Sequence, residues 1–253
     1  CTYDGPVYYV STQGSDFFGI GSEQNPFLTI QKGIDTVSDG DTVSVAAGTY
    51  VENIVISDKE IYLSSQSGSN LTVIKPLQVN TNTLSISNNN SEISGFTFTG
   101  SGNSGSSIII NTGEPIIEQC IFHSNASNNS IMIHSSNPVM NNILFYNYEG
   151  GGDHAIYWNN DSNPIINNST IVNYGGTIFN GGDIVNNAII TFNNCILQGN
   201  SYEGPYEINY SIVSPTAVGS TNLNADPLFT DPDNGDYNLQ WGSPAIDTGD
   251  PNL

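Results

Sequence analysis

Ionisable and aromatic side chains gather around one glycine run near the middle of the chain, in NYEGGGDHAIYWNNDSN, residues 147–163. A carboxylate beside an imidazole can work as a general acid–base pair, and Glu149, Asp153 and His154 have the residue types for it. Adjacent Asp and His residues also occur by chance, and a solvated loop is the simpler interpretation. We therefore assign no catalytic residue from the sequence and keep these three as candidates.

A second set of carboxylates lies in DPDNGD, residues 231–236. Asp231, Asp233 and Asp236 supply the oxygen ligands that Ca²⁺ prefers, so this segment is the candidate metal site. It departs from the EF-hand loop, because its glycine comes one position early and Gly242 stands where that loop has a glutamate. A type I turn is the alternative interpretation. The three histidines have no metal-ligand spacing, and no other cofactor is expected.

The elements that must position these side chains repeat along the chain. PIIEQCIFHSN, PVMNNILFYN, PIINNSTIVN and ITFNNCILQGN share one order of apolar and polar residues. Their bulky residues, with the last phenylalanine of ISGFTF before them, are 24, 23, 26 and 26 residues apart: Phe98, Phe122, Phe145, Ile171 and Leu197. Such a period predicts a stacked-repeat fold, and short strand-like runs bounded by Gly, Asn, Ser and Pro predict strands. The repeat is too short for a βαβ unit, which leaves one turn of a parallel β-helix.

Paired asparagines recur inside these runs, although asparagine is a poor strand former. The first members share one repeat position and the second members share the next: Asn141, Asn167 and Asn193, then Asn142, Asn168 and Asn194. Amides stacked in register can hydrogen-bond from coil to coil as a ladder, and asparagine also tolerates the left-handed backbone of a corner. We predict a ladder or corner role for these residues.

Aromatic residues between positions 146 and 179 fall on adjacent coils of such a fold. Those that face outward would form a platform suited to stacking on sugar rings. Because strand side chains alternate, about half of them should face the core instead. The candidate glycan-binding residues are Tyr148, Tyr157, Trp158 and Tyr174.

The charge of the chain limits its partners. Its 253 residues include 24 acidic residues, three lysines and no arginine, for a net charge of −21. Nucleic acid and anionic membrane surfaces both need basic residues, so neither is an expected partner. The sequence contains no run that predicts a transmembrane segment, so no direct membrane insertion is expected. A surface rich in amides, hydroxyls and glycine is common in secreted β proteins, which favours an extracellular or cell-surface location.

Two of the three cysteines, Cys120 and Cys195, occupy equivalent repeat positions three coils apart. At β stacking distance they should be roughly 14 Å apart, whereas a disulfide needs Cα atoms within about 7 Å. We therefore expect them to be reduced, buried and not linked to each other. Cys1 could be the lipidated residue of a bacterial lipoprotein, or only a domain boundary, which we favour.

The whole chain, 1–253, is expected to form one domain in three parts. Residues 1–41 form an N-terminal cap with an amphipathic helix over about 26–38, in which Pro26 suits the first turn and Ile30 and Ile34 share one face. Residues 42–213 form the stacked coils, and residues 214–253, rich in Pro, Gly and Asp, form a closing segment that covers the last coil or continues past it.

Three segments near the N-terminus resemble the entry of right-handed parallel β-helix proteins of the pectate-lyase-like class: YYVSTQGSD, NPFLTIQKGID and GDTVSVAAGTYVENIVI. DPLFTDPDNGDYNLQWGSPAIDTGDP is similar to the closing segment of extracellular bacterial members. The resemblance implies an all-β, right-handed parallel β-helix solenoid with an N-terminal capping α-helix, in a bacterial or archaeal extracellular protein. It does not set the activity, because the class includes lyases, hydrolases, epimerases and non-enzymatic surface proteins.

The motifs of two enzyme groups in that class are missing. The lyases that cleave uronate polymers use calcium-binding carboxylates with an Arg or Lys base, whereas Lys32, Lys59 and Lys75 all lie in the first third of this chain. The galacturonases show clustered aspartates and Gly-His-Gly, and neither occurs here. A carboxylate pair for glycoside hydrolysis must lie about 5–10 Å apart. The nearest candidates are Glu149, Asp153, Asp161 and Asp183, all readable as solvated loop charges.

These observations predict a non-catalytic extracellular or cell-surface module, structural, adhesive or filament-forming, that could bind glycans. Its partner would be a polysaccharide or another cell-surface component. The two open ends of a solenoid would also allow end-to-end self-assembly. The alternative is a polysaccharide-active enzyme, a glycoside hydrolase sooner than a lyase.

Overall fold

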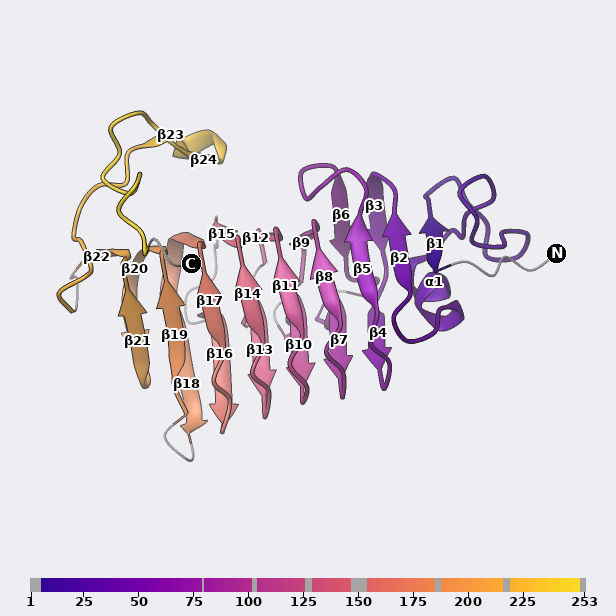
Figure 1. The fold of residues 1–253 in the computed structure, drawn as a ribbon, viewed down its shortest axis with the longest axis horizontal. Helices are drawn as coiled ribbons and strands as arrows, with labels where there is room; N and C mark the ends of the chain where they lie inside the picture. Colours follow the sequence, from indigo (N-terminus) through magenta and orange to yellow (C-terminus); the bar gives the residue numbers. More distant parts are fainter. Residues whose placement is uncertain are drawn as a thin grey trace.

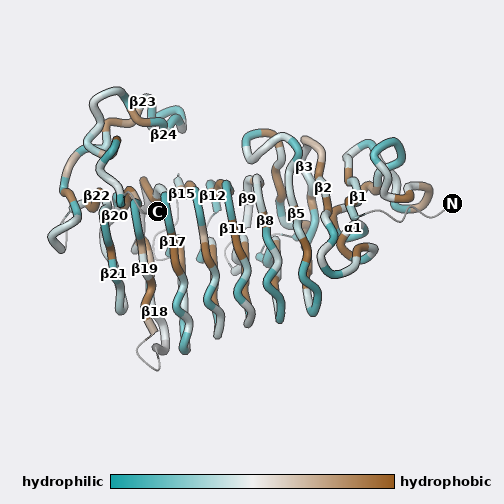
Figure 2. The backbone as a smooth tube through the Cα atoms, viewed as in Figure 1, coloured by the Kyte–Doolittle hydropathy of each residue, from teal (hydrophilic) through white to brown (hydrophobic). Residues whose placement is uncertain are grey.

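The protein is a right-handed parallel β-helix, as the repeats and the resemblance predict. The computed structural model describes residues 6–78, 80–101, 104–125, 129–146, 154–184, 188–215 and 219–250, with only the backbone of 160, 173–176, 183, 184 and 200. Figure 1 shows the coils stacked side by side along the long axis of the molecule. Figure 2 shows hydrophobic and hydrophilic stretches alternating along each coil. In the described part of the chain, no helix is long and apolar enough to span a membrane.

One face of the solenoid is a nine-stranded parallel sheet with one strand from each coil. Its strands, in order, are β1 (Val7–Val10), β2 (Thr42–Val45), β5 (Tyr62–Ser65), β8 (Glu92–Ser94), β11 (Ile116–Glu118), β14 (Val139–Asn141), β17 (Ile165–Asn167), β19 (Ile190–Asn193) and β21 (Tyr206–Asn209). From β8 to β19, neighbouring strands are 23 to 26 residues apart in sequence, so one repeat forms one coil, whereas the other neighbours in this sheet are 16 to 35 residues apart.

The other two faces form one 13-stranded sheet. Its first arm holds β3 (Gly48–Val51), β6 (Thr72–Lys75), β9 (Thr97–Thr99), β12 (Ile121–His123) and β15 (Leu144–Tyr146). Its second arm holds β4 (Ile54–Ser57), β7 (Leu84–Ser87), β10 (Ile108–Asn111), β13 (Ile131–His134) and β16 (His154–Asn160). The long β18 (Thr170–Ile184) joins the arms, and β20 (Ile196–Glu203) pairs with β18 and with β22 (Ile212–Ser214).

The predicted inward row is confirmed. Phe98, Phe122, Phe145, Ile171 and Leu197 pair in register from strand to strand. All five side chains are at most 1% exposed. The rings of Phe98 and Phe122 stack with centroids 5.3 Å apart, and those of Phe122 and Phe145 with centroids 4.7 Å apart. The core is therefore continuous from coil to coil.

The predicted asparagine ladder is present at the end of the nine-stranded sheet. Asn209 Nδ2 donates to Asn193 Oδ1 at 3.1 Å, and Asn193 Nδ2 donates to Asn167 Oδ1 at 3.0 Å. Asn167 Nδ2 then donates to Asn141 Oδ1 at 3.0 Å, and Asn141 Nδ2 to Glu118 Oε1 at 2.8 Å. Every amide donates toward the N-terminal coils, and the acceptor-only carboxylate of Glu118 ends the ladder.

The second asparagine of each pair forms the corner after the strand. Asn142, Asn168 and Asn194 have φ angles of 55°, 52° and 55°, in the left-handed region that asparagine tolerates. Gln119 and Tyr210 hold the same corner on the coils to either side, with φ angles of 51° and 50°. The corner side chains of Asn142 and Asn168 are exposed.

The N-terminal helix is shorter than predicted. Helix α1 spans Ile30–Thr36, and its first turn is capped by the Thr29 hydroxyl, which accepts from Lys32 N. Residues 26–29 do not join it, because Phe27 forms a parallel bridge with Val10 in β1. The segment therefore covers the outer edge of β1, so strand addition at this end would have to displace it. End-to-end self-assembly stays a prediction.

Cys120 and Cys195 are free and buried, which confirms that they are not linked. Burial raises the pKa of each thiol to about 12, so both stay protonated at neutral pH. Cys1 lies outside the described residues, and its lipidation stays a prediction.

The C-terminal segment folds back along the outside of the coils (Figure 1). It contains β23 (Phe229–Asp231), the 3-10 helix η1 (Pro232–Asn234) and β24 (Asp236–Leu239), with β23 and β24 antiparallel. Phe229 is buried in a small second core with Val172, Ile196 and Ile212. This core fixes the segment against the outward face of the 13-stranded sheet and creates a cleft there.

Candidate functional site

The structure places the sequence-predicted catalytic residues apart from this cleft or leaves them undescribed. Tyr148, Glu149 and Asp153 lie outside the described residues. His154 begins β16 and is half-buried, on the second arm of the sheet. Asp161 is an exposed turn residue beyond β16, and the side chain of Asp183 is not described. A pairing of Asp153 with His154 stays a prediction.

The predicted aromatic platform needs correction. Trp158 is fully buried and packs on the ring of Phe179, with centroids 5.8 Å apart, so it cannot contact a glycan. It pairs in register with the inward Ile133, whereas Tyr157 on the opposite face is half-buried near His134, at 6.4 Å between ring centroids. Tyr174 lies in β18, but its side chain is not described.

The candidate calcium ligands do not converge. Asp231 Oδ2 accepts from Asn234 Nδ2 at 2.8 Å, within the turn around η1. Asp236 Oδ1 accepts from Asn238 N at 3.0 Å and from Asn238 Nδ2 at 2.6 Å, and Asp233 is exposed. Among the described residues, no three His, Cys, Asp or Glu side chains are grouped to hold a metal ion. The segment forms the 3-10 helix η1 followed by Gly235 in the left-handed conformation, and a calcium site here stays a prediction.

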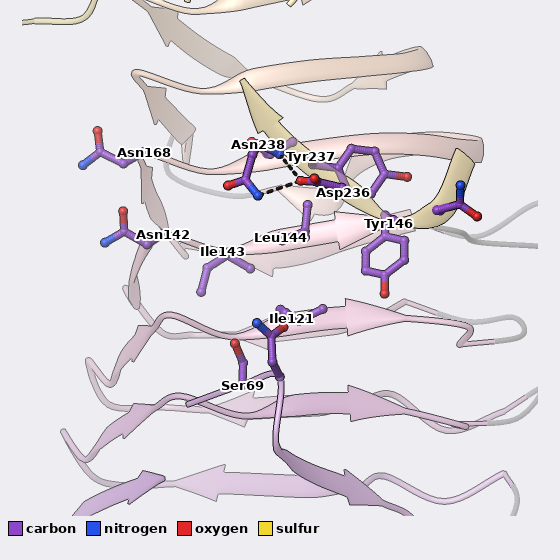
Figure 3. A pocket seen from close by; sticks show the side chains of 14 residues that line it. Ser69, Ile121, Asn142, Ile143, Leu144, Tyr146, Asn168, Asp236, Tyr237 and Asn238 are labelled. Carbon is purple, nitrogen blue, oxygen red and sulfur yellow. Dashed lines mark hydrogen bonds between the residues drawn. The ribbon is translucent and has the colours of Figure 1, made fainter. Parts of the chain in front are cut away.

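The cleft has a volume of about 540 Å³ and lies between the first arm of the sheet and the β23–β24 hairpin. Figure 3 shows its side chains. One wall is the outward row Ile121, Leu144 and Thr170, which pair in register across β12, β15 and β18. The rest of its lining is Ser69, Asn70, Asn142, Ile143, Tyr146, Asn168, Asn234, Gly235, Asp236, Tyr237 and Asn238. Amides, hydroxyls and two aromatic rings therefore meet around an apolar floor.

Two tyrosines hold the hairpin against the coils. The rings of Tyr146 and Tyr237 have centroids 5.2 Å apart, and burial raises the pKa of Tyr146. Gly235 has a φ of 82° and sits beside the Tyr146 ring, where an added Cβ would come within 3.6 Å. Glycine is the residue that adopts this backbone without strain. The hairpin thus fixes Asp236 and Tyr237 at the mouth of the cleft.

A row of outward side chains that includes an ammonium group and an imidazole ends at Tyr146, which lines the cleft. His123 stacks on Tyr146 with ring centroids 5.1 Å apart, and it pairs in register with Tyr146 on one side and Thr99 on the other. Continuing the register of Ile74 with Phe98 by one residue places Lys75 beside Thr99. Burial lowers the pKa of His123, and the positive charge of Lys75 lowers it further. The imidazole is therefore neutral at neutral pH, the form that accepts a proton.

The sequence contains a signal for this row. Lys75, Thr99, His123 and Tyr146 each directly follow the inward residue of their repeat, so aligning the repeats places them in one outward column. The absence of Lys and Arg beyond position 75 therefore does not remove positive charge from this row, because Lys75 acts on His123 from two coils away.

Comparison with known proteins supports the fold. No protein-family model matches the chain, and no curated protein matches its sequence. Solved structures do match: a pectin methylesterase from carrot at 11% identity, covering 88% of each chain with a TM-score of 0.58. A pectin methylesterase from Aspergillus niger matches at 9% identity, covering 89% of this chain and 92% of that one, TM-score 0.57. Pectate lyase Pel9A matches at 12% identity over 100% and 94%, TM-score 0.54.

These neighbours correct the functional interpretation of the sequence. We predicted a non-catalytic structural or adhesive module, whereas the similar structures are those of enzymes that act on pectin or pectate. Missing motifs led to the prediction, but a motif search reads only residues close in sequence, and the outward row assembles from four separate coils. The finding favours the alternative, a polysaccharide-active enzyme. At these identities the likeness itself extends to the fold only.

Proposed function

We propose that this protein is a polysaccharide-active enzyme that works outside the cell, with its reaction centre at His123 beside the cleft. The observation that carries the proposal is the outward row of an ammonium, an imidazole of lowered pKa and an aromatic ring, which ends at a cleft lined with amides. Perturbed titratable groups beside a cleft mark candidate reaction sites. The fold shared with pectin-acting enzymes supports the same proposal.

His123 is the general base in this proposal. Its neutral ring takes a proton from a water molecule, whose oxygen forms a bond to the carbon of the glycosidic or ester linkage to be hydrolysed. The bond from that carbon to the leaving oxygen breaks, and the proton passes from His123 to the leaving oxygen. Tyr146 and Tyr237 are partly exposed and line the cleft, where their phenol groups offer contacts to a sugar. Hydrolysis fits this face better than elimination, because elimination builds enolate charge that needs closely placed cations, and Lys75 is the one lysine on this row.

The test is a screen of the purified chain against polysaccharides, with separate assays for new reducing ends, released ester acids or alcohols, and unsaturated products. The active polymer is then given to His123→Asn, which keeps a polar side chain but loses the basic ring nitrogen. The matched control is His134→Asn, a half-buried histidine on the second arm, whose Nδ1 lies 2.8 Å from Asn159 Oδ1. Loss of activity in both variants, or in neither, would contradict the assignment.

A further inference from the structure

Asparagine amides line the cleft more densely than any other polar group. Five of its lining residues are Asn70, Asn142, Asn168, Asn234 and Asn238, and Ser69 and Thr170 add hydroxyls. Among the residues that the structure describes, the side-chain amides of Asn142 and Asn168 have no hydrogen-bond partner. An amide offers two donors and an acceptor, which suits a sugar hydroxyl that both donates and accepts.

These amides form a strip that crosses the coils. Asn142 and Asn168 occupy the same corner on consecutive coils, about 4.8 Å apart, and Figure 3 shows them one above the other at one side of the cleft. A second cavity of about 280 Å³ shares Asn168 and Thr170 with the first and continues to Asn194. There Asp250 N donates to Asn194 Oδ1 at 2.7 Å, so the C-terminal segment occupies the Asn194 amide and the strip ends at this residue. The spacing is close to the length of one sugar unit in an extended polymer.

Positive charge is almost absent from this strip. Lys59 donates its ammonium protons to Ile34 O and Val37 O, at 2.9 and 2.8 Å, and so serves the end of helix α1. Lys32 holds its ammonium over the Phe27 ring, 5.7 Å from the centroid. With no arginine in the chain, Lys75 is the one remaining cation. The charged side chain that lines the cleft is the carboxylate of Asp236.

We infer that this site takes an uncharged polysaccharide, with neutral or fully esterified sugars, laid across the coils along the asparagine strip; the inference rests on the proposed function. A polyuronate carries one carboxylate per sugar. Burying several of these against amides, beside Asp236 and within a field of net charge −21, leaves them without cationic partners. Lys75 could offset one of them. Uncharged sugars have no such penalty, and their hydroxyl groups still form hydrogen bonds with the asparagine amides.

The experiment measures binding without turnover, in the full chain carrying His123→Asn. The probes are polygalacturonate, the same polymer fully methyl-esterified, and a neutral glucomannan, each set in native gels at low and high NaCl. We expect each of the two uncharged polymers to retard the protein to the same extent at low and at high NaCl. At low NaCl, polygalacturonate should bind at least tenfold more weakly than either uncharged polymer. Tighter binding of polygalacturonate at low salt, or no binding of any probe, would overturn the inference.

The strip itself is tested with the double variant Asn142→Gly, Asn168→Gly. Glycine keeps the left-handed corner, so the variant removes the amides without backbone strain. We expect roughly thirtyfold weaker binding of the uncharged polymers, which corresponds to about 1 kcal/mol for each of the two amides. The control is Gln119→Gly, an exposed corner of the same column outside the cleft. An equal loss in the control would remove the strip from the ligand site.

The inference and the proposed function can fail separately. Hydrolysis of a polyuronate that depends on His123 would refute the uncharged ligand and leave the enzyme assignment intact. Binding of uncharged polymers through the two corner amides, with no turnover by the unmodified chain, would refute the enzyme assignment and leave the ligand class intact.

Discussion

Replacing one amide in the middle of the asparagine ladder should cost more stability than replacing the amide at its end. Asn167 makes two ladder bonds, since it donates to Asn141 and accepts from Asn193, both at 3.0 Å. Asn209 makes one, at 3.1 Å to Asn193. A hydrogen bond contributes about 0.5–1.5 kcal/mol net. Asn167→Ala should therefore lower the free energy of unfolding by about 1–3 kcal/mol, and Asn209→Ala by about half as much.

The assay is equilibrium unfolding in urea, followed by the fluorescence of the buried Trp158. The midpoint should fall in the order unmodified, Asn209→Ala, Asn167→Ala, with the same denaturant slope in all three if the same surface unfolds. A combined Asn141→Ala, Asn167→Ala variant should lose less than the sum of the two single changes, because the bond between them is counted once in the pair. Equal midpoints for Asn167→Ala and Asn209→Ala would refute the ladder as a source of stability.

Three further predictions concern the row, the core and the thiols. Lys75→Met removes a positive charge that opposes protonation of His123, so the pKa of His123 should rise, and high salt should act in the same direction; NMR titration of the imidazole measures both. Because the folded-state pKa of His123 is lowered, the unfolded chain binds its proton first, and His123 should cost stability as the pH falls through its ordinary value. Phe145→Ala should cost about 3–5 kcal/mol in urea unfolding, since it opens a cavity against Phe122. Cys120 and Cys195, with pKa values of about 12, should resist thiol reagents at pH 8 until urea unfolds the chain, whereas rapid labelling of the folded protein would contradict their burial.

The coils could be predicted from the sequence because each coil repeats the same pattern of inward and corner residues. A bulky residue every 23 to 26 positions must point inward, and on three coils a pair of asparagines four and three positions before it must supply a ladder rung and a corner. Each repeat therefore gives independent evidence for the same register. The structure confirms that register at Phe98, Phe122 and Phe145.

Trp158 was assigned to the wrong face of its strand, although the strand phase of the repeats indicates the inward face. Placing Ile131 of SIMIHSS opposite Ile156 of HAIYWNN, so that the second segment starts one residue earlier, pairs Ile133 with Trp158, and Ile133 belongs to an inward row. We grouped the aromatic residues by proximity along the chain instead of by their phase in the strand. A shift of one residue moves a side chain to the opposite face, so Tyr157 faces outward and Trp158 lies in the core.

The cleft had no sequence signal of this kind. It forms because residues 229–239 fold back onto strands that precede them by about 60 to 110 positions. The contacts that fix this segment, such as Tyr237 on Tyr146 and Phe229 on Val172, belong to no repeat. Periodicity predicts which residues face outward, but it does not predict which part of the outward face a non-repeating tail will cover.

The most direct test of the proposed function compares two pKa values for the same residue. One comes from the acid limb of kcat/KM on the hydrolysed polymer, and the other from the NMR titration of His123 in the free protein. If His123 is the general base, the two pKa values agree, both lie below the ordinary histidine value, and both rise together in Lys75→Met. An acid limb that stays in place in Lys75→Met while the NMR pKa moves, or that persists in His123→Asn, would contradict the account.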